Sequence, residues 1–151
     1  YEMKIFNLFL LGLCLSFSAV AADNGMVMKA SKYSVAETMD RFEAEAKAKG
    51  FNVVARVDHA AAAEKAGMKM PASQLLIFGN PKGGTPLMLA SPTAGIDLPL
   101  KALAYEDAEG KIWLAYNAAD YLKSRHAISG KDEAMGNMNK ALDAMVTKAV
   151  E

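Results

Sequence analysis

The feature that most constrains the fold is a run of four apolar residues, Leu75–Phe78, followed by glycine, proline and asparagine residues in Gly79–Pro86. A short apolar run bounded by turn residues is typical of a β-strand that is buried on both faces. Glycines permit positive φ and prolines fix it, so the second segment predicts a rigid, shaped loop. We expect a central strand, this loop, and a short helix over residues 87–90.

The first residues of the chain predict an export signal. Lys4 is a short positive region, Ile5–Phe17 is an apolar core, and Ala19–Ala21 is a small-residue cleavage signal. The apolar core is shorter than the roughly 20 residues of a comfortable transmembrane span, which leaves an uncleaved anchor as the alternative. We expect residues 1–22 to be removed, with residues 1–2 as a vector remnant, and the protein to be periplasmic or secreted.

The remainder, residues 23–151, has the size of a single domain. The 17 basic and 17 acidic residues balance. This balance provides no long-range field for nucleic acid, and we expect neither a nucleic-acid partner nor a membrane partner after cleavage. The only cysteine, Cys14, lies in the signal. No cysteine-based metal site or haem attachment is therefore possible in the mature chain, and the sequence identifies no other cofactor.

Periodic patterns predict strands alternating with helices. Ser34 and Glu37 form a capping box that starts a helix over residues 34–49. Asp58 caps a short alanine-rich helix that ends at Gly67. Strands are predicted over residues 26–33, 51–58, 73–78, 100–106 and 111–116, the last two joined by a turn at Asp107–Gly110, and a short helix capped by Asn117 over residues 118–124.

Apolar residues recur at helical spacing near the C-terminus. This stripe predicts a helix whose face packs on the core, with Asp132 and Glu133 in its first turn, where the helix dipole favours anions. Methionine sulfur can ligate a soft metal, but core packing explains the spacing better. The stripe comprises Met135, Met138, Leu142, Met145, Val146 and Ala149.

Apolar residues also occupy both faces of the strand predicted over residues 111–116. Ile112, Leu114 and Tyr116 share one face, and Trp113 and Ala115 share the other. Because successive side chains of a strand point to opposite faces, we expect this hairpin to be covered or paired on both sides.

Several short motifs occur in a specific order. They are Gly50-Phe51, Asp58-His59, Phe78-Gly79-Asn80-Pro81, Gly84-Thr85-Pro86-Leu87-Met88, Asp97-Leu98-Pro99-Leu100-Lys101, Tyr116-Asn117, Tyr121-Leu122 and Arg125-His126. With these motifs the chain resembles the domain-of-unknown-function 302 family from about Tyr33 to the C-terminus. It departs from the family at Ala127, where many members have glycine.

The resemblance implies an α+β fold like that of the TATA-binding protein, in which a curved antiparallel sheet of about five strands grips a long C-terminal helix. Members of the family look dimeric, which implies a homodimer. The family has no established activity. Its fold relative binds DNA, but a fold does not carry a function with it.

The two histidines after the signal, His59 and His126, are candidate metal ligands, with Asp58 or Glu106 as a carboxylate and Tyr116 nearby. The alternative is structural: His59 caps the alanine-rich helix, and His126 ends a helix by bonding loop carbonyls. Acidic residues at turns, such as those from Asp97 to Glu109, are interpreted as solvated charges.

The Gly79–Pro86 segment approaches a phosphate-binding pattern, but no lysine follows Gly84. Asn80 is instead expected to tie the loop together. Lys123, Arg125 and His126 form a small cationic cluster that could hold an anion.

Three functions remain open. The first is a non-catalytic binding or sensing module for a small ligand or a metal ion, with its cleft bordered by candidates Asn80, Thr85, Tyr116, Arg125 and His126. The second is a hydrolase-like enzyme in which His126 acts as acid or base and Arg125 anchors an anion. The third is a self-associating structural protein. The absence of a thiol, a triad motif and a strong metal cluster favours binding, but the sequence does not decide whether the protein is an enzyme.

Overall fold

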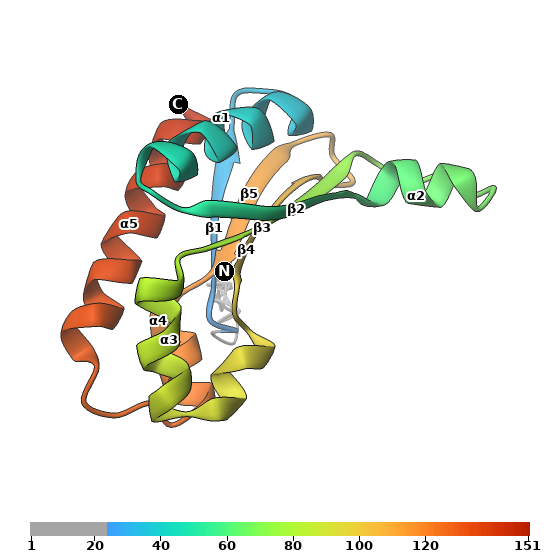
Figure 1. The fold of residues 1–151 in the computed structure, drawn as a ribbon. Helices are drawn as coiled ribbons and strands as arrows, with labels where there is room; N and C mark the ends of the chain where they lie inside the picture. Colours follow the sequence, from blue (N-terminus) through green and yellow to red (C-terminus); the bar gives the residue numbers. More distant parts are fainter. Residues whose placement is uncertain (1–23) are drawn as a thin grey trace, which may run out of the picture.

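The computed structural model describes residues 24–151, which form a five-stranded sheet flanked by helices (Figure 1). The predicted export signal, residues 1–22, lies outside the described residues. The elements are β1 (Met26–Ser31), α1 (Val35–Ala48), β2 (Asn52–Asp58), α2 (His59–Lys65), β3 (Ser73–Gly79), α3 (Pro81–Ala90), the 3-10 helix η1 (Pro92–Ile96), β4 (Leu100–Glu106), β5 (Ile112–Asn117), α4 (Ala119–Arg125) and α5 (Asp132–Val150).

The strands lie in the order β1-β5-β4-β3-β2, and all neighbouring strands are antiparallel. The register shifts once, between Val53 and Ala55 of β2. The prediction of an α+β fold with a curved antiparallel sheet of about five strands and a long C-terminal helix is confirmed. The middle strand is β4 and not, as predicted, the strand Ser73–Gly79, which lies next to it.

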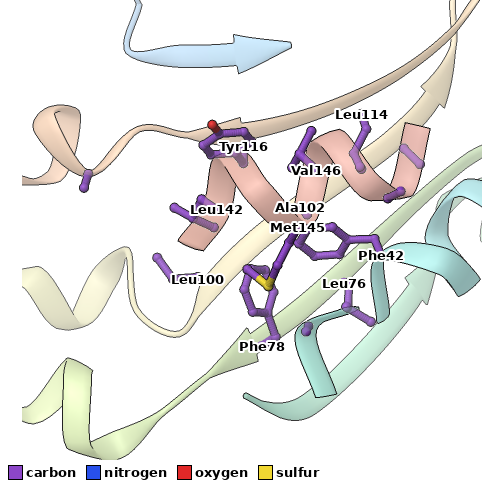
Figure 2. Packing of buried hydrophobic residues seen from close by; sticks show 14 of the residues in the cluster. Phe42, Leu76, Phe78, Leu100, Ala102, Leu114, Tyr116, Leu142, Met145 and Val146 are labelled. Carbon is purple, nitrogen blue, oxygen red and sulfur yellow. The ribbon is translucent and has the colours of Figure 1, made fainter. Parts of the chain in front are cut away.

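The core lies between one face of the sheet and helices α1 and α5 (Figure 2). Phe42 of α1 and Phe78 of β3 meet edge to face, with ring centroids 5.2 Å apart. Met145 of α5 is fully buried beside them. The methionine stripe of α5 is therefore core, as its spacing predicted, apart from Met138, which is only partly buried.

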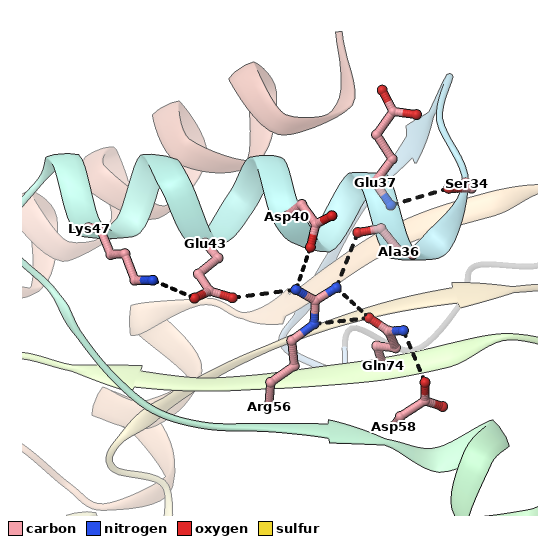
Figure 3. A network of polar contacts seen from close by, with 9 residues as sticks. All are labelled: Ser34, Ala36, Glu37, Asp40, Glu43, Lys47, Arg56, Asp58 and Gln74. Atoms are coloured by element: carbon pink, nitrogen blue, oxygen red, sulfur yellow. Dashed lines mark hydrogen bonds and ion pairs between the residues drawn. The ribbon is translucent and has the colours of Figure 1, made fainter.

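A polar network fixes α1 over β2 and β3 (Figure 3). The Ser34 hydroxyl accepts a hydrogen bond from the Glu37 amide at 3.2 Å, which confirms the predicted N-cap. Arg56 of β2 reaches the Asp40 carboxylate of α1 at 2.5 Å and donates to the Gln74 side chain of β3 at 2.7 Å and 3.0 Å. One guanidinium thus joins three elements.

The Gly79–Pro86 segment is mostly helix, and the prediction of a loop was wrong. Asn80 caps α3, because its side-chain oxygen accepts from the Lys82 amide at 2.9 Å. Pro81 takes the first helical position, where no donor is needed. None of the glycines in this segment has positive φ. Burial of Leu87 in the core offsets the poor helix propensity of this composition.

Among residues 24–151, helices cover only the face of the sheet that holds the core. On the opposite face, an apolar row follows the strand pairing across all five strands: Val57, Leu75, Leu103, Ala115 and Met28. Met28 is 48% exposed, and Leu75 and Leu103 are half-buried. The expectation that the hairpin is covered on both sides is thus met by helices on one side only.

Candidate functional site

A cavity of about 660 Å³ lies between α3 and the first half of α5, and we name it the α3–α5 cavity. Its walls come from the start of β2, the end of β3, α3, the segment Leu98–Leu100 and one face of α5. On α5, the lining residues Ala134, Asn137, Met138 and Ala141 follow helical spacing. Two small alanines on this face leave the space that larger side chains would fill.

Among the described residues 24–151, those that line the cavity include no Asp, Glu, Lys, Arg or His. Apolar contacts come from side chains such as Phe51, Met88 and Leu98. Its polar side chains are three asparagines and one threonine: Asn52, Asn80, Asn137 and Thr85. The cavity therefore suits an uncharged molecule, because a charged group would be desolvated there without an opposite charge.

Two glycines shape the cavity wall. A Cβ at Gly79 would lie 3.2 Å from Cβ of Pro99, so glycine permits the close approach of the segment after η1 to β3. The Leu98–Pro99 peptide bond in that segment is cis. A Cβ at Gly83 would meet nothing within 4 Å, so this position of α3 is open.

The polar side chains of the cavity differ in how many hydrogen bonds they already make to other residues of the protein. Both ends of the Asn80 amide are used, by the Lys82 amide at 2.9 Å and the Gly50 carbonyl at 3.5 Å. The side chains of Thr85 and Asn137 make no hydrogen bond among residues 24–151. Together with Asn52, whose side chain also makes no hydrogen bond among these residues, they are the groups that remain available to a ligand.

A second group of residues surrounds a buried histidine, and we name it the His126 cluster: Thr93, Asp97, Tyr121, Arg125 and His126. His126, 7% exposed, contacts the Asp97 carboxylate through Nε2 and Thr93 Oγ1 through Nδ1 at 2.9 Å. Arg125 reaches the other oxygen of Asp97 at 3.4 Å and donates to the Tyr121 hydroxyl at 3.0 Å. The cluster joins η1 and the segment after it to α4.

The structure assigns partners to side chains that the sequence left open. Asp97, interpreted as a solvated charge, is paired with His126 and Arg125. His126 bonds side chains and not the loop carbonyls expected in the structural alternative. Neither ring nitrogen of His126 is free, and none of the cluster residues lines the α3–α5 cavity.

The candidate ligand-binding residues therefore lie in three separate parts of the structure. Asn80 and Thr85 line the α3–α5 cavity, while Arg125 and His126 belong to the His126 cluster. Tyr116 lies in the core, where burial, and secondarily the Asp143 charge, raises the pKa of its hydroxyl. Sequence reasoning did not find Asn137, because a cavity wall built from five segments has no local signature. Leu98 stood in a family motif but was not proposed as a site residue.

The two histidines proposed as metal ligands are not brought together. His59 begins α2, which follows the last residue of β2, and it is exposed. His126 is the C-cap of α4, which begins two residues after the end of β5. Antiparallel pairing places these two strand ends at opposite ends of the sheet. Among residues 24–151, no group of three or more His, Cys, Asp or Glu could hold a metal ion.

The family of the chain follows from its match to a family model. The model for "Domain of unknown function DUF302" matches residues 27–145, most of the part that the structure describes. The chain belongs to the DUF302 family. A crystal structure of an uncharacterized conserved DUF302 protein from Bacillus stearothermophilus has the same fold, with a TM-score of 0.75 and 18% identity, over 83% of this chain and 98% of that one.

Curated relatives of this DUF302 chain are longer proteins. The protein named Fluoride-specific ion channel FluC 1 of Brucella suis biovar 1 (strain 1330) is 46% identical over 125 residues, which make up 83% of this chain and 47% of that protein. The protein of the same name from Brucella abortus biovar 1 (strain 9-941) is also 46% identical over 125 residues, which make up 44% of that protein. The chain spans less than half of each. Within residues 24–151, no helix is long and apolar enough to cross a membrane.

Proposed function

We propose that this domain binds a small, uncharged and largely apolar molecule in the α3–α5 cavity. The observation that carries the proposal is a cavity of about 660 Å³ without one ionisable side chain in its lining. Small-molecule sites are mostly apolar concavities of about 300 to 1,000 Å³ with a few placed polar groups. The polar groups that would orient the ligand are the side chains of Asn52, Thr85 and Asn137, which make no hydrogen bond among the described residues.

A pair of fluorescent probes tests both the apolar and the uncharged character of the ligand. N-phenylnaphthylamine is neutral, and its sulfonated analogue carries the same rings with a negative charge. We expect saturable binding of the neutral probe and binding of the analogue weaker by about tenfold or more, because its charge would be desolvated. Equal affinities for the two probes, or no saturable binding of the neutral one, would contradict the proposal.

Two alanines of α5 provide a matched pair of variants. Ala134 lines the cavity and Ala144 does not, and both are exposed. Ala134→Phe fills the space, so we expect it to weaken neutral-probe binding by about tenfold. Ala144→Phe adds the same side chain elsewhere on the helix and should bind the probe like the wild type. Equal binding by the two variants would place the probe outside the cavity.

Fluoride conduction is a property named for the relatives, and we propose a different ligand for the half that they share with this chain. A fluoride ion needs cations or several hydrogen-bond donors, and the cavity lining has no cation. Arg125 is engaged by Asp97 and Tyr121. Fluoride should therefore not compete with the neutral probe in a titration, and competition would overturn this part of the proposal.

Binding is favoured over the hydrolase-like alternative by the state of the proposed acid or base. His126 is buried and both of its ring nitrogens are occupied, and Arg125, the proposed anion anchor, is paired. A broad hydrolase panel tests the alternative. Activity that disappears in His126→Asn while the fold is retained would favour the enzyme.

Self-association is a second proposal, supported by the apolar row on the face of the sheet that lacks helices. In this row Met28 is exposed, Val57, Leu75 and Leu103 are half-buried and Ala115 is buried, and apolar patches at a surface often mark interfaces between copies of a chain. Met28 is the most accessible member of the row. We expect a dimer in sedimentation equilibrium, weakened by about tenfold or more in Met28→Glu and unchanged in Met68→Glu, which alters an exposed methionine away from the row. A wild-type monomer throughout a dilution series would refute it.

Export remains a proposal that rests on the pattern of residues 1–22. N-terminal sequencing of protein recovered from a periplasmic extract tests it. A chain that begins after Ala21 or Ala22 is expected, whereas a chain that begins at Met3 would show that no cleavage occurs.

A further inference from the structure

The surface formed by α3 and η1 contains no charged residue from Gly83 to Ile96. Elsewhere charges are frequent, since 23% of the chain is Asp, Glu, Lys or Arg. The two helices lie together at one end of the molecule (Figure 1), and we name this surface the α3–η1 tip. Leu89 and Ile96 of the tip are 81% and 72% exposed, the highest values of any large hydrophobic side chain in residues 24–151.

The tip adjoins the α3–α5 cavity. Thr85 lines the cavity, and Leu89 follows it by one helical turn on the same side of α3. Met88 lines the cavity and also packs against η1, because a Cβ at Gly95 would lie 3.5 Å from its sulfur. An apolar surface thus continues from the cavity onto the outside of the protein.

Exposed cations flank the uncharged segment of the tip in the sequence. They are Lys82, directly before Gly83, and Lys101, five residues after Ile96. The acid between these lysines in the sequence, Asp97, is paired with Arg125 and contacts His126. Exposed apolar side chains bordered by cations are the composition of protein segments that lie in the interface of an anionic membrane.

We propose that the α3–η1 tip docks the domain on an anionic lipid membrane, which supplies the apolar ligand of the α3–α5 cavity. The inference rests on the proposed function, because an apolar ligand is concentrated in membranes. A second copy of the chain is a poorer occupant, since a two-fold contact through the tip would bring the lysines Lys82 and Lys101 of both copies into one interface. No membrane partner was expected from the balanced charge of the whole chain. That balance is an average over the chain and does not describe the local composition of the tip.

Co-sedimentation with vesicles of phosphatidylcholine and phosphatidylglycerol in a three-to-one ratio tests docking. We expect the wild type to bind, and the double variant Leu89→Gln/Ile96→Gln to bind at least about tenfold more weakly. Met68→Gln/Met70→Gln removes two exposed methionines elsewhere and should bind like the wild type. Binding should also fall with salt and in Lys82→Gln/Lys101→Gln.

Neutral-probe binding without vesicles separates this inference from the proposed function. The Leu89→Gln/Ile96→Gln variant should bind the probe like the wild type, which also shows that it is folded. Probe binding by the wild type without vesicle binding overturns docking alone, as does equal vesicle binding by the tip and methionine variants. Self-association that disappears in the tip variant would assign the surface to a second copy and overturn the membrane as its occupant.

Discussion

The α3–α5 cavity and the His126 cluster share one short segment, Asp97–Leu100, but have opposite chemistry. Asp97 belongs to the cluster, in which a carboxylate, an imidazole and a guanidinium satisfy one another. Leu98, Pro99 and Leu100 line the cavity, which has no ionisable group. The residue types that suggest chemistry in the sequence are therefore engaged in holding the fold, and the free binding capacity lies among apolar residues beside them.

The largest effect expected from this comparison is on stability. His126→Ala removes a buried partner and leaves the Asp97 carboxylate with Arg125 alone, so we expect a loss of about 3 kcal/mol in the free energy of unfolding. Urea denaturation measures it. His59→Ala is the matched control, since His59 is exposed, and it should change the free energy by less than about 0.5 kcal/mol. Equal effects of the two substitutions would mean that the cluster does not hold the fold.

A smaller effect of opposite sign is expected directly after the cluster. Ala127 has a φ of +50°, a conformation that costs a residue with a Cβ about 1–2 kcal/mol. Glycine adopts it freely but loses more chain entropy on folding, by about 0.4–1 kcal/mol. Ala127→Gly should therefore stabilise the protein by about 0.5–1 kcal/mol in the same urea assay. A loss of stability would show that this turn does not require the left-handed conformation.

Much of the fold could be predicted from local pattern. The helix over residues 34–49 has a side-chain cap and an apolar stripe, and these local signals agree with its tertiary packing. Helix α3 could not be predicted in this way. Propensity scales penalise glycine and proline inside a helix, whereas here the Asn80 cap and buried Leu87 outweigh the penalty. The family resemblance also drew attention to Ala127, where the structure shows positive φ.

Much less of the candidate site could be predicted. Asn80 and Thr85 stand in a motif and do line the cavity, but His126 attracted attention through its chemistry and is engaged in a structural contact. Asp97 was interpreted as a solvated charge and Asn137 was not singled out, because the partners of the first and the unbonded side chain of the second depend on distant segments. Sequence indicates which groups could react, and tertiary structure decides which of them are available.

The substitution Asn137→Leu tests whether the α3–α5 cavity binds its ligand mainly through apolar contacts. The Asn137 side chain is exposed and makes no hydrogen bond among the described residues, so we expect its loss to change the free energy of unfolding by less than about 0.5 kcal/mol. The added apolar surface should raise the affinity for neutral N-phenylnaphthylamine by about two- to fivefold. A lower affinity would mean that the Asn137 amide contributes more to binding this probe than the added apolar surface does.

The smallest effect is expected at a carboxylate that belongs to neither region, Asp107 in the turn between β4 and β5. The Trp113 indole N–H at 2.7 Å, and then the Lys111 and Glu109 amides, lower the pKa of Asp107 below 3.8. Because the folded protein favours the ionised form, Asp107 stabilises the fold above this pH and loses its contribution as the pH falls through the lowered value. The difference in urea midpoint between wild type and Asp107→Asn, followed by Trp113 fluorescence, should therefore be constant near neutral pH and shrink below about pH 4. In His126→Ala the Asp107 contacts are untouched, so the same pH-dependent difference should appear in that background, and its absence would mean that the turn and the His126 cluster are coupled through the sheet.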